Sequence, residues 1–190
     1  NMVIRSDNKA FLDACSLYLK QLTDQVRDLQ ITKGGPIIMV QAENEFGSYV
    51  SQRKDIPLEK HRSYNEKIKE QLLAYGIDVP LFTSDGSWLF KGGSIKGVLP
   101  TANGENSIEK LKKAVNEYND GKGPYMVAEF YPGWLSHWAE PFPSVTTESV
   151  VKQTKIYLDA GVSFNFYMVH GGTNFGFTSG ANYGNETDIQ

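Results

Sequence analysis

Apolar residues recur at helical spacing in four segments of the chain. The first segment opens near Ser6 or Asp7, which are good capping residues, and stops at the Lys-Gly-Gly run at 33–35. The second spans about 57–75, the third follows a cap at Asn106 or Ser107, and the fourth covers about 146–160. Four amphipathic helices are therefore predicted. Their expected buried positions are Phe11, Leu12, Cys15, Leu19, Leu22, Val26 and Leu29; then Tyr64, Ile68 and Leu72; then Ile108, Leu111, Val115 and Tyr118; and last Val150, Val151 and Leu158.

Short apolar runs lie between these helical segments. They cover residues 36–42, 79–85, 96–104, 125–130 and 162–172. Each run is nearly apolar throughout, so both of its faces are expected to be buried, which is typical of parallel strands covered by helices. Strands that alternate with amphipathic helices predict an α/β protein.

Two α/β arrangements fit this alternation, an open doubly wound sheet or a (β/α)₈ barrel. An open sheet that binds nucleotides usually has a glycine-rich phosphate loop after an early strand, and the chain contains neither GxGxxG nor GxxxxGK[ST]. Polar residues instead end several of the predicted strands, as expected for the mouth of a barrel. These residues are Glu43–Glu45, Ser84, Asp85, Asn103, Glu129 and His170–Asn174.

The number of predicted strands is smaller than a complete barrel requires. A closed barrel has eight strands and typically about 250 residues, whereas this chain has five predicted strands in 190 residues. We therefore expect residues 1–190 to form one partial catalytic (β/α)₈ domain, equivalent to about strands 4 to 8. Roughly three strands are expected to precede it, and further segments to follow it.

Composition excludes several classes of partner. With 19 basic and 22 acidic side chains, the net charge of −3 gives no reason to expect nucleic acid or an anionic membrane as a partner. No apolar run approaches the roughly 20 residues that a membrane span needs.

The single cysteine, Cys15, excludes an internal disulfide, and its place in the first apolar series indicates a core residue rather than a catalytic thiol.

Two glutamates at strand ends are the main candidates for chemistry. Glu45 follows the first predicted strand, and Glu129 lies at the end of the fourth, among aromatic residues. Hydrolysis of a glycosidic bond needs one carboxylic acid to protonate the leaving oxygen and one carboxylate to attack or assist at the anomeric carbon. Either residue could instead be a helix cap or part of a surface salt bridge. Asn44 could offer an amide hydrogen bond to a sugar hydroxyl, and Glu43 is interpreted as a supporting neighbour.

The other candidates are weaker. Trp134 and, less so, Trp138 could form a platform for the apolar face of a sugar ring, although core packing is the alternative. His170 and Asn174 are interpreted as shaping a loop, because no further His or Cys lies near His170 at metal-ligand spacing. Asp85 is expected to bond neighbouring loop amides rather than to act as a third acid. No metal or organic cofactor is implied.

Three long motifs resemble glycoside hydrolase family 35, the retaining β-galactosidases. They are GGPIIMVQAENEFGSY at 34–49, AEFYPGWLSHW at 128–138 and FYMVHGGTNFGFTSGANY at 166–183. The resemblance implies that Glu45 is the acid/base on barrel strand four and Glu129 the nucleophile on strand seven. It also implies that Asn44 contacts the sugar beside the acid/base and that Trp134 lies close to the sugar. Further galactose contacts in the family come from the first three strands.

The prediction for function is a retaining exo-β-galactosidase that removes terminal non-reducing β-D-galactose by double displacement. One alternative is a related exo-β-glycosidase such as an exo-β-glucosaminidase, which would share the carboxylate pair. The other is a carbohydrate-binding pseudoenzyme, which would be expected to have lost one of the two glutamates. A carbohydrate is the expected partner, and the family resemblance alone suggests a secreted, periplasmic or lysosomal location.

Overall fold

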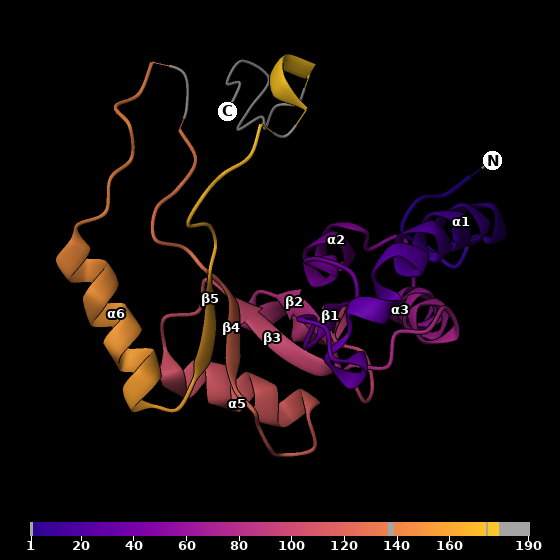
Figure 1. Ribbon diagram of the computed structural model, residues 1–190, viewed down its shortest axis with the longest axis horizontal. Coiled ribbons are helices and arrows are strands. Elements are labelled where there is room, and N and C mark those ends of the chain that lie inside the picture. The colour runs from indigo at the N-terminus through magenta and orange to yellow at the C-terminus, as the bar shows by residue number, and fades with distance from the viewer. Residues whose placement is uncertain (1, 137–138, 174, 179–190) are drawn as a thin grey trace.

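The computed structural model describes residues 2–136, 139–173 and 175–178, which form a five-stranded parallel sheet with helices between the strands (Figure 1). Each strand pairs with the next one along the chain, so the sheet order is β1-β2-β3-β4-β5 and the sheet curls into half a barrel. This confirms the predicted α/β class and partial barrel. The strands are β1 Val40–Gln41, β2 Leu81–Asp85, β3 Leu99–Asn103, β4 Met126–Phe130 and β5 Ser163–Phe166.

The four predicted helices are present, and two short helices join them. The α-helices are α1 Lys9–Val26, α2 Phe46–Gln52, α3 Leu58–Ala74, α4 Phe90–Gly93, α5 Ile108–Tyr118 and α6 Thr147–Asp159. Asn8 caps α1, one or two residues later than predicted, and Ser107 caps α5. Sequence patterns did not predict α2 or α4, because seven and four residues are too few to show an apolar periodicity.

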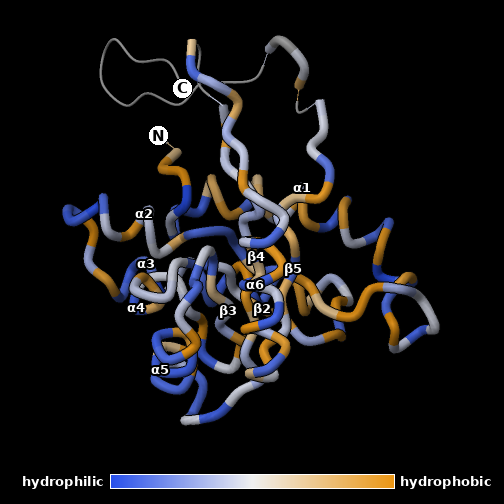
Figure 2. Tube along the Cα trace, turned by 90° about the vertical axis from the view of Figure 1, so that its left-hand side faces the viewer, coloured by the Kyte–Doolittle hydropathy of each residue, from blue (hydrophilic) through white to orange (hydrophobic). Residues whose placement is uncertain are grey.

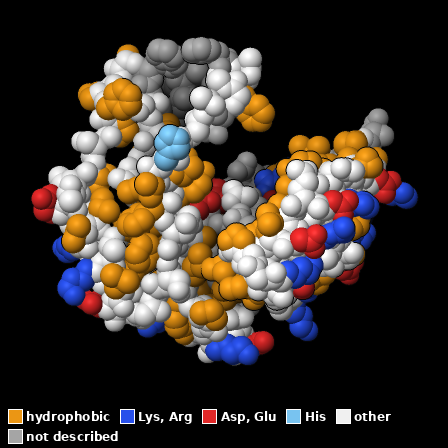
Figure 3. All heavy atoms as spheres, in the orientation of Figure 1, with side chains coloured by type: hydrophobic (Ala, Val, Ile, Leu, Met, Phe, Trp, Pro, Cys, Tyr) orange, Lys and Arg blue, Asp and Glu red, His pale blue; other side chains and the backbone are white. Residues whose placement is uncertain are grey.

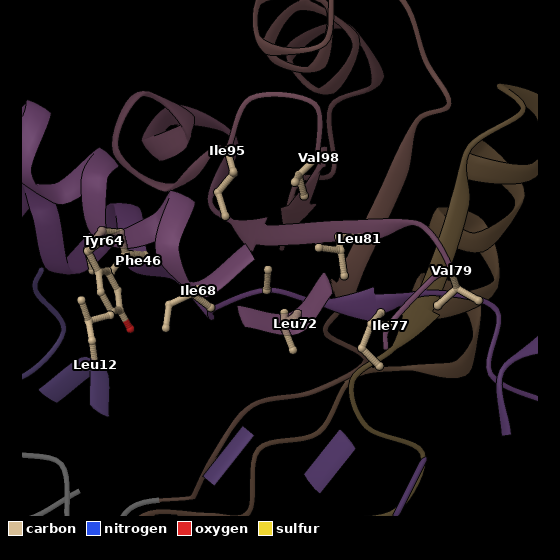
Figure 4. Packing of buried hydrophobic residues seen from close by; sticks show 11 residues of the cluster. Leu12, Phe46, Tyr64, Ile68, Leu72, Ile77, Val79, Leu81, Ile95 and Val98 are labelled. Atoms are coloured by element: carbon tan, nitrogen blue, oxygen red, sulfur yellow. The ribbon is translucent and has the colours of Figure 1, made fainter. Parts of the chain in front are cut away.

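One core cluster lies between β1, β2 and the helices α1 and α3 (Figure 4). Tyr64, Ile68 and Leu72 of α3 are buried in it, as predicted. The prediction for α1 is only partly right, since Leu22 and Leu29 are exposed. Burial raises the pKa of the Cys15 thiol, which packs against this cluster, and this supports its interpretation as a packing residue. The buried members are Leu12, Ala42, Phe46, Tyr64, Ile68, Leu72, Ile77, Val79, Leu81, Ile95 and Val98.

A second core cluster joins α5 and α6 to strands β3, β4 and β5. Phe130 and Tyr157 meet edge to face at its centre, with ring centroids 5.2 Å apart. The prediction that α6 buries Val151 and Leu158 is wrong, because they are 58% and 64% exposed. Val150 and Tyr157 face the core. Val151 and Leu158 each follow one of them directly, and the turn of about 100° per residue in an α-helix points them away from the core. Figure 2 shows that hydrophilic residues predominate on α5, on the outside of the sheet.

The first and last strands are shorter than the predicted runs. β1 has only two residues; among the described residues it has a strand on one side only, and Ile38 before it is exposed. β5 ends at Phe166; the Tyr167 amide still donates to the Phe130 carbonyl of β4 at 2.8 Å, and residues 168–172 leave the ladder. No helix within the described ranges is both long and apolar enough to cross a membrane.

Candidate active site

The carboxyl ends of the five parallel strands meet at one edge of the sheet, and polar side chains gather there. Figure 3 shows the surface hollowed between the side that carries β4, β5 and α6 and the side that carries α1, α2 and α3, with an acidic side chain visible in the hollow. Side chains at four consecutive strand ends reach this edge. They are Glu45 after β1, Asp85 of β2, Asn103 of β3 and Glu129 of β4.

The turn after β1 has an unusual backbone. Glu43 and Glu45 have φ values of 62° and 47°, in the left-handed region that costs about 1–2 kcal/mol for a residue with a side chain. The chain is therefore not extended here, and the alternation of side chains along a strand does not apply. The Glu45 amide donates to the Ser84 carbonyl at 2.7 Å, which ties the turn to the end of β2. Strain of this kind persists only where surrounding contacts enforce it.

Glu43 is occupied by structural contacts. Its carboxylate accepts two hydrogen bonds from Arg5, at 3.1 and 2.7 Å, and one from the Tyr64 hydroxyl at 2.6 Å. Arg5 also donates to the Asn44 carbonyl at 2.7 Å, and its guanidinium lies over the ring of Phe46. Glu43 thus anchors the segment before α1 and helix α3 to the turn that carries Glu45, consistent with its interpretation as a supporting neighbour.

Asn103 joins the two candidate glutamates. Its side-chain Nδ2 donates to Glu45 Oε1 at 3.1 Å, and its backbone is paired with that of Glu129 in the ladder between β3 and β4. The Ser84 hydroxyl donates to Asn103 Oδ1 at 2.6 Å, so the amide is oriented with its N–H groups toward the glutamates. The sequence places Glu45 and Glu129 more than eighty residues apart, and the fold brings both of them against one amide.

Glu129 is half-buried and has a second donor. The Tyr131 hydroxyl donates to Glu129 Oε2 at 2.9 Å. Burial raises the pKa of the Glu129 carboxyl, and the charge of Glu45 adds to the rise, while hydrogen bonds from Tyr131 and Asn103 oppose it. Burial and the adjacent Glu129 raise the pKa of Tyr131, so its hydroxyl stays protonated and keeps donating.

A hollow of about 490 Å³ opens beside Glu129, within the usual size range of small-molecule sites. Tyr131, Trp134, Tyr167 and Met168 contribute to its wall. Trp134 is 63% exposed and meets the Tyr131 ring edge to face, with centroids 5.3 Å apart. The indole is therefore fixed by a neighbour and still presents an open surface next to a carboxylate.

Asn44 is exposed and lines a second hollow, of about 540 Å³, together with Glu129 and Tyr167. Asn44 Oδ1 accepts a hydrogen bond from Gln41 at 2.8 Å. This contact turns the amide so that Nδ2, which has no partner among the described residues, is left available to donate. Asn44 thus lies in a position to contact a ligand that reaches Glu129.

The remaining predictions have different outcomes. Asp85 accepts a hydrogen bond from the Gly47 amide at 2.7 Å, which confirms a structural bond to a backbone amide, although this amide lies in the first turn of α2 rather than in a loop. His170 is exposed, and no group of three or more His, Cys, Asp or Glu side chains suited to a metal occurs in the described part of the chain. Trp138 and Asn174 lie outside the described residues. Tyr131 was not predicted, although it stands two residues after Glu129 in the second motif.

A curled parallel sheet with outer helices and two glutamates at its carboxyl edge is the architecture of barrel glycosidases. The chain belongs to the glycosyl hydrolases family 35, whose family model matches residues 1–189. This match confirms the resemblance carried by the three motifs.

The chain is similar to several curated proteins over nearly its whole length. It is 39% identical over 181 residues to human "Beta-galactosidase-1-like protein 2". This alignment covers 95% of the chain and 27% of that protein. It is 36% identical over 182 residues to rat "Beta-galactosidase-1-like protein 3" (96% and 27%), and 34% identical over 187 residues to human "Beta-galactosidase" (96% and 26%). The chain therefore spans about a quarter of the length of these relatives.

Proposed function

We propose that the complete protein is a retaining exo-β-galactosidase that removes terminal non-reducing β-D-galactose from oligosaccharides or glycoconjugates. The observation that carries this proposal is that the Asn103 side-chain amide donates to Glu45 and also hydrogen-bonds Glu129, which places both carboxyl groups together at the sheet edge. Membership of the glycosyl hydrolases family 35 and the similarity to a protein named "Beta-galactosidase" support the choice of galactose.

The reaction runs by double displacement. In the first step Glu129 attacks the anomeric carbon, Glu45 gives its proton to the glycosidic oxygen, and the leaving alcohol departs. In the second step Glu45 removes a proton from water, the oxygen bonds to the anomeric carbon, and the bond to Glu129 breaks. Retention requires the two carboxyl groups to lie about 5 to 5.5 Å apart, whereas inversion would need about 6.5 to 9.5 Å.

The surroundings of the two glutamates support these roles. A nucleophilic carboxylate must be ionised; burial raises the pKa of Glu129, and the hydrogen bonds that Tyr131 and Asn103 donate to its charged form oppose this rise. Asn103 donates to Glu45 Oε1, and this bond fixes the direction in which Glu45 can deliver a proton.

The sugar would lie in the hollow beside Glu129. The exposed face of Trp134 suits the apolar face of a galactose ring, and the Nδ2 of Asn44 suits a ring hydroxyl. The five strands described here would be strands 4 to 8 of the barrel, with the other strands supplied by sequence outside residues 1–190. Those strands would contribute the remaining contacts to galactose.

A panel of nitrophenyl glycosides, hydrolysed by the complete protein, tests the proposal. We expect turnover of the β-galactoside to exceed that of the β-glucoside and the β-glucosaminide, and expect Glu45→Gln and Glu129→Gln to lose it. A matched control is Thr101→Val, which removes a buried hydroxyl of β3 away from the sheet edge. Preference for the glucosaminide would favour the related exo-β-glycosidase, and sugar binding without turnover would favour a pseudoenzyme.

A further inference from the structure

Asp85 is a buried carboxylic acid next to the turn that carries Glu45. It is 1% exposed, and its Oδ1 accepts a hydrogen bond from the amide of Gly47, two residues after Glu45. It lines neither of the two hollows at the sheet edge. Asp85 therefore has no route to a substrate, and any influence it has on the reaction must act through its neighbours.

Two glycines close around the Asp85 carboxyl group. A Cβ atom on Gly93 would lie 2.1 Å from Asp85 Oδ2, and a Cβ atom on Gly47 would lie 2.9 Å from Oδ1. A side chain at position 93 would therefore displace the Asp85 carboxyl group. At Gly47 the nearest obstacle is the Leu89 carbonyl oxygen, 2.3 Å from a Cβ atom, so that glycine also serves the contact between α2 and Leu89. The backbone at Gly93 in α4 is thus fitted closely to the Asp85 carboxyl group.

The contacts of Ser84 and Asp85 bracket Glu45 on both sides. The Glu45 amide donates to the Ser84 carbonyl at 2.7 Å, and the Gly47 amide donates to the Asp85 side chain at the same distance. Glu45 lies between these two bonds with a left-handed φ of 47°, a conformation that would relax without external support. The Glu45 carbonyl also accepts from the Ser48 amide at 3.0 Å, and Phe46 is buried, so loss of the Asp85 bond would remove one of several restraints on the chain immediately after Glu45.

We propose that Asp85 is a positioning residue for Glu45, holding the left-handed backbone that aims the Glu45 carboxyl group into the site. The proposal rests on the proposed role of Glu45 as the acid/base. Proton transfer depends steeply on geometry, and a misplacement of about 1 Å can cost on the order of 10²-fold in rate. Asp85 acts in this account as a hydrogen-bond acceptor rather than as an acid.

The electrostatic surroundings of Asp85 are consistent with a residue that accepts the Gly47 hydrogen bond without needing a negative charge. Burial raises the pKa of the Asp85 carboxyl group to about 7, the nearby charges of Glu45 and Glu43 add to the rise, and Gly47 and Arg5 oppose it. A protonated carboxyl group can still accept from Gly47 through Oδ1. Asparagine has the same shape and also keeps an acceptor oxygen, which makes Asp85→Asn the conservative variant.

The test compares two leaving groups in the complete protein. 2,4-Dinitrophenyl β-D-galactoside needs no proton from the enzyme to lose its aryl group, whereas methyl β-D-galactoside does, because an alkoxide leaves poorly. The readout is the ratio of kcat/KM for the methyl glycoside to kcat/KM for the dinitrophenyl glycoside. A loss of folded protein lowers both constants equally and leaves this ratio unchanged.

We expect the ratio to fall by on the order of 10²-fold in Asp85→Ala and to stay near the wild-type value in Asp85→Asn. If Asp85→Ala does not fold, Asp85→Ser is judged by the same ratio, because its short hydroxyl cannot reach Gly47. An unchanged ratio in the alanine or serine variant overturns the proposal. A fall in Asp85→Asn as large as in Asp85→Ala also overturns it.

Two further variants separate this proposal from the proposed function. Glu45→Ala must itself lower the ratio, and if it does not, the assignment of Glu45 fails whatever Asp85 does. Thr101→Val removes a buried hydroxyl on the neighbouring strand, and it should leave the ratio unchanged.

Discussion

The side chain of Asn103 donates to Glu45 Oε1 at 3.1 Å, while the backbone of Asn103 is paired with that of Glu129 on the next strand. The Asn103 side chain also hydrogen-bonds the Glu129 carboxylate, so one amide contacts two carboxylates from distant parts of the chain. Asn103→Ala removes the donor, and we expect kcat for nitrophenyl β-galactoside to fall by on the order of 10²-fold. Thr101→Val, two residues earlier on the same strand, should cost about 1 kcal/mol of stability and leave kcat unchanged. A wild-type kcat in Asn103→Ala would contradict this role.

The hydroxyl of Tyr131 donates to the charged form of Glu129, and this contact opposes the rise that burial causes in the pKa of Glu129. In Tyr131→Phe the opposing bond is lost, so the pKa of Glu129 should rise further. In the proposed mechanism Glu129 attacks as the carboxylate, so the acidic limb of the pH profile of kcat/KM should move to higher pH. A profile that matches the wild type, or one that moves to lower pH, would show that the bond does not stabilise the carboxylate.

Loss of the Glu43 side chain is predicted to lower stability, because this carboxylate anchors Arg5 and Tyr64. Glu43→Ala removes the carboxylate that pairs with Arg5 and accepts from the Tyr64 hydroxyl, and we expect a loss of about 2–3 kcal/mol in the free energy of unfolding. The matched control is Lys9→Ala, which breaks an exposed pair with Asp13 and should cost less than about 0.5 kcal/mol. Urea unfolding measures both values, and equal midpoints for the two variants would rule out the anchoring role of Glu43.

The buried Asp85 should make stability depend on pH. The pKa of Asp85 is about 7 in the folded protein, against about 4 in the unfolded chain. Between these values the folded state binds more protons, so the free energy of unfolding contributed by this group falls as pH rises from about 4 to about 7. Asp85→Asn has no carboxyl group at this position to titrate, so its free energy of unfolding lacks this decrease. The difference in Tm between Asp85→Asn and the wild type should therefore increase across this window, and a constant difference would argue against a buried, proton-binding Asp85.

Much of the fold could be predicted from the sequence, because strongly periodic segments predict their own structure. The face of α3 formed by Tyr64, Ile68 and Leu72 and the apolar strands β2 to β4 illustrate this. Periodicity was misleading where tertiary neighbours decide burial. Leu22 of α1 and Leu158 of α6 continue an apolar series and are nevertheless exposed in the described structure.

The contacts at the site were harder to predict, because they depend on side chains that the fold brings together from distant segments. Glu45 and Glu129 could be named from their places at strand ends, and Asp85 could be named as an acceptor for a backbone amide. The left-handed backbone at Glu45 could not, since it requires contacts from Ser84 and Asp85 on another strand. The hydroxyl of Tyr131 likewise has no signal in periodicity, although it lies within the second motif.

Trapping of a glycosyl-enzyme intermediate tests whether Glu129 is the nucleophile of a retaining reaction. A fluorinated galactosyl donor such as 2-deoxy-2-fluoro-β-D-galactosyl fluoride should form a long-lived bond to the enzyme, because the fluorine slows the second step. Intact mass spectrometry of the complete protein, followed by peptide mapping, measures this bond directly. We predict one fluorogalactosyl group per chain, attached to Glu129 and absent from Glu129→Gln. An adduct that persists in Glu129→Gln, or that maps to another residue, would contradict the account.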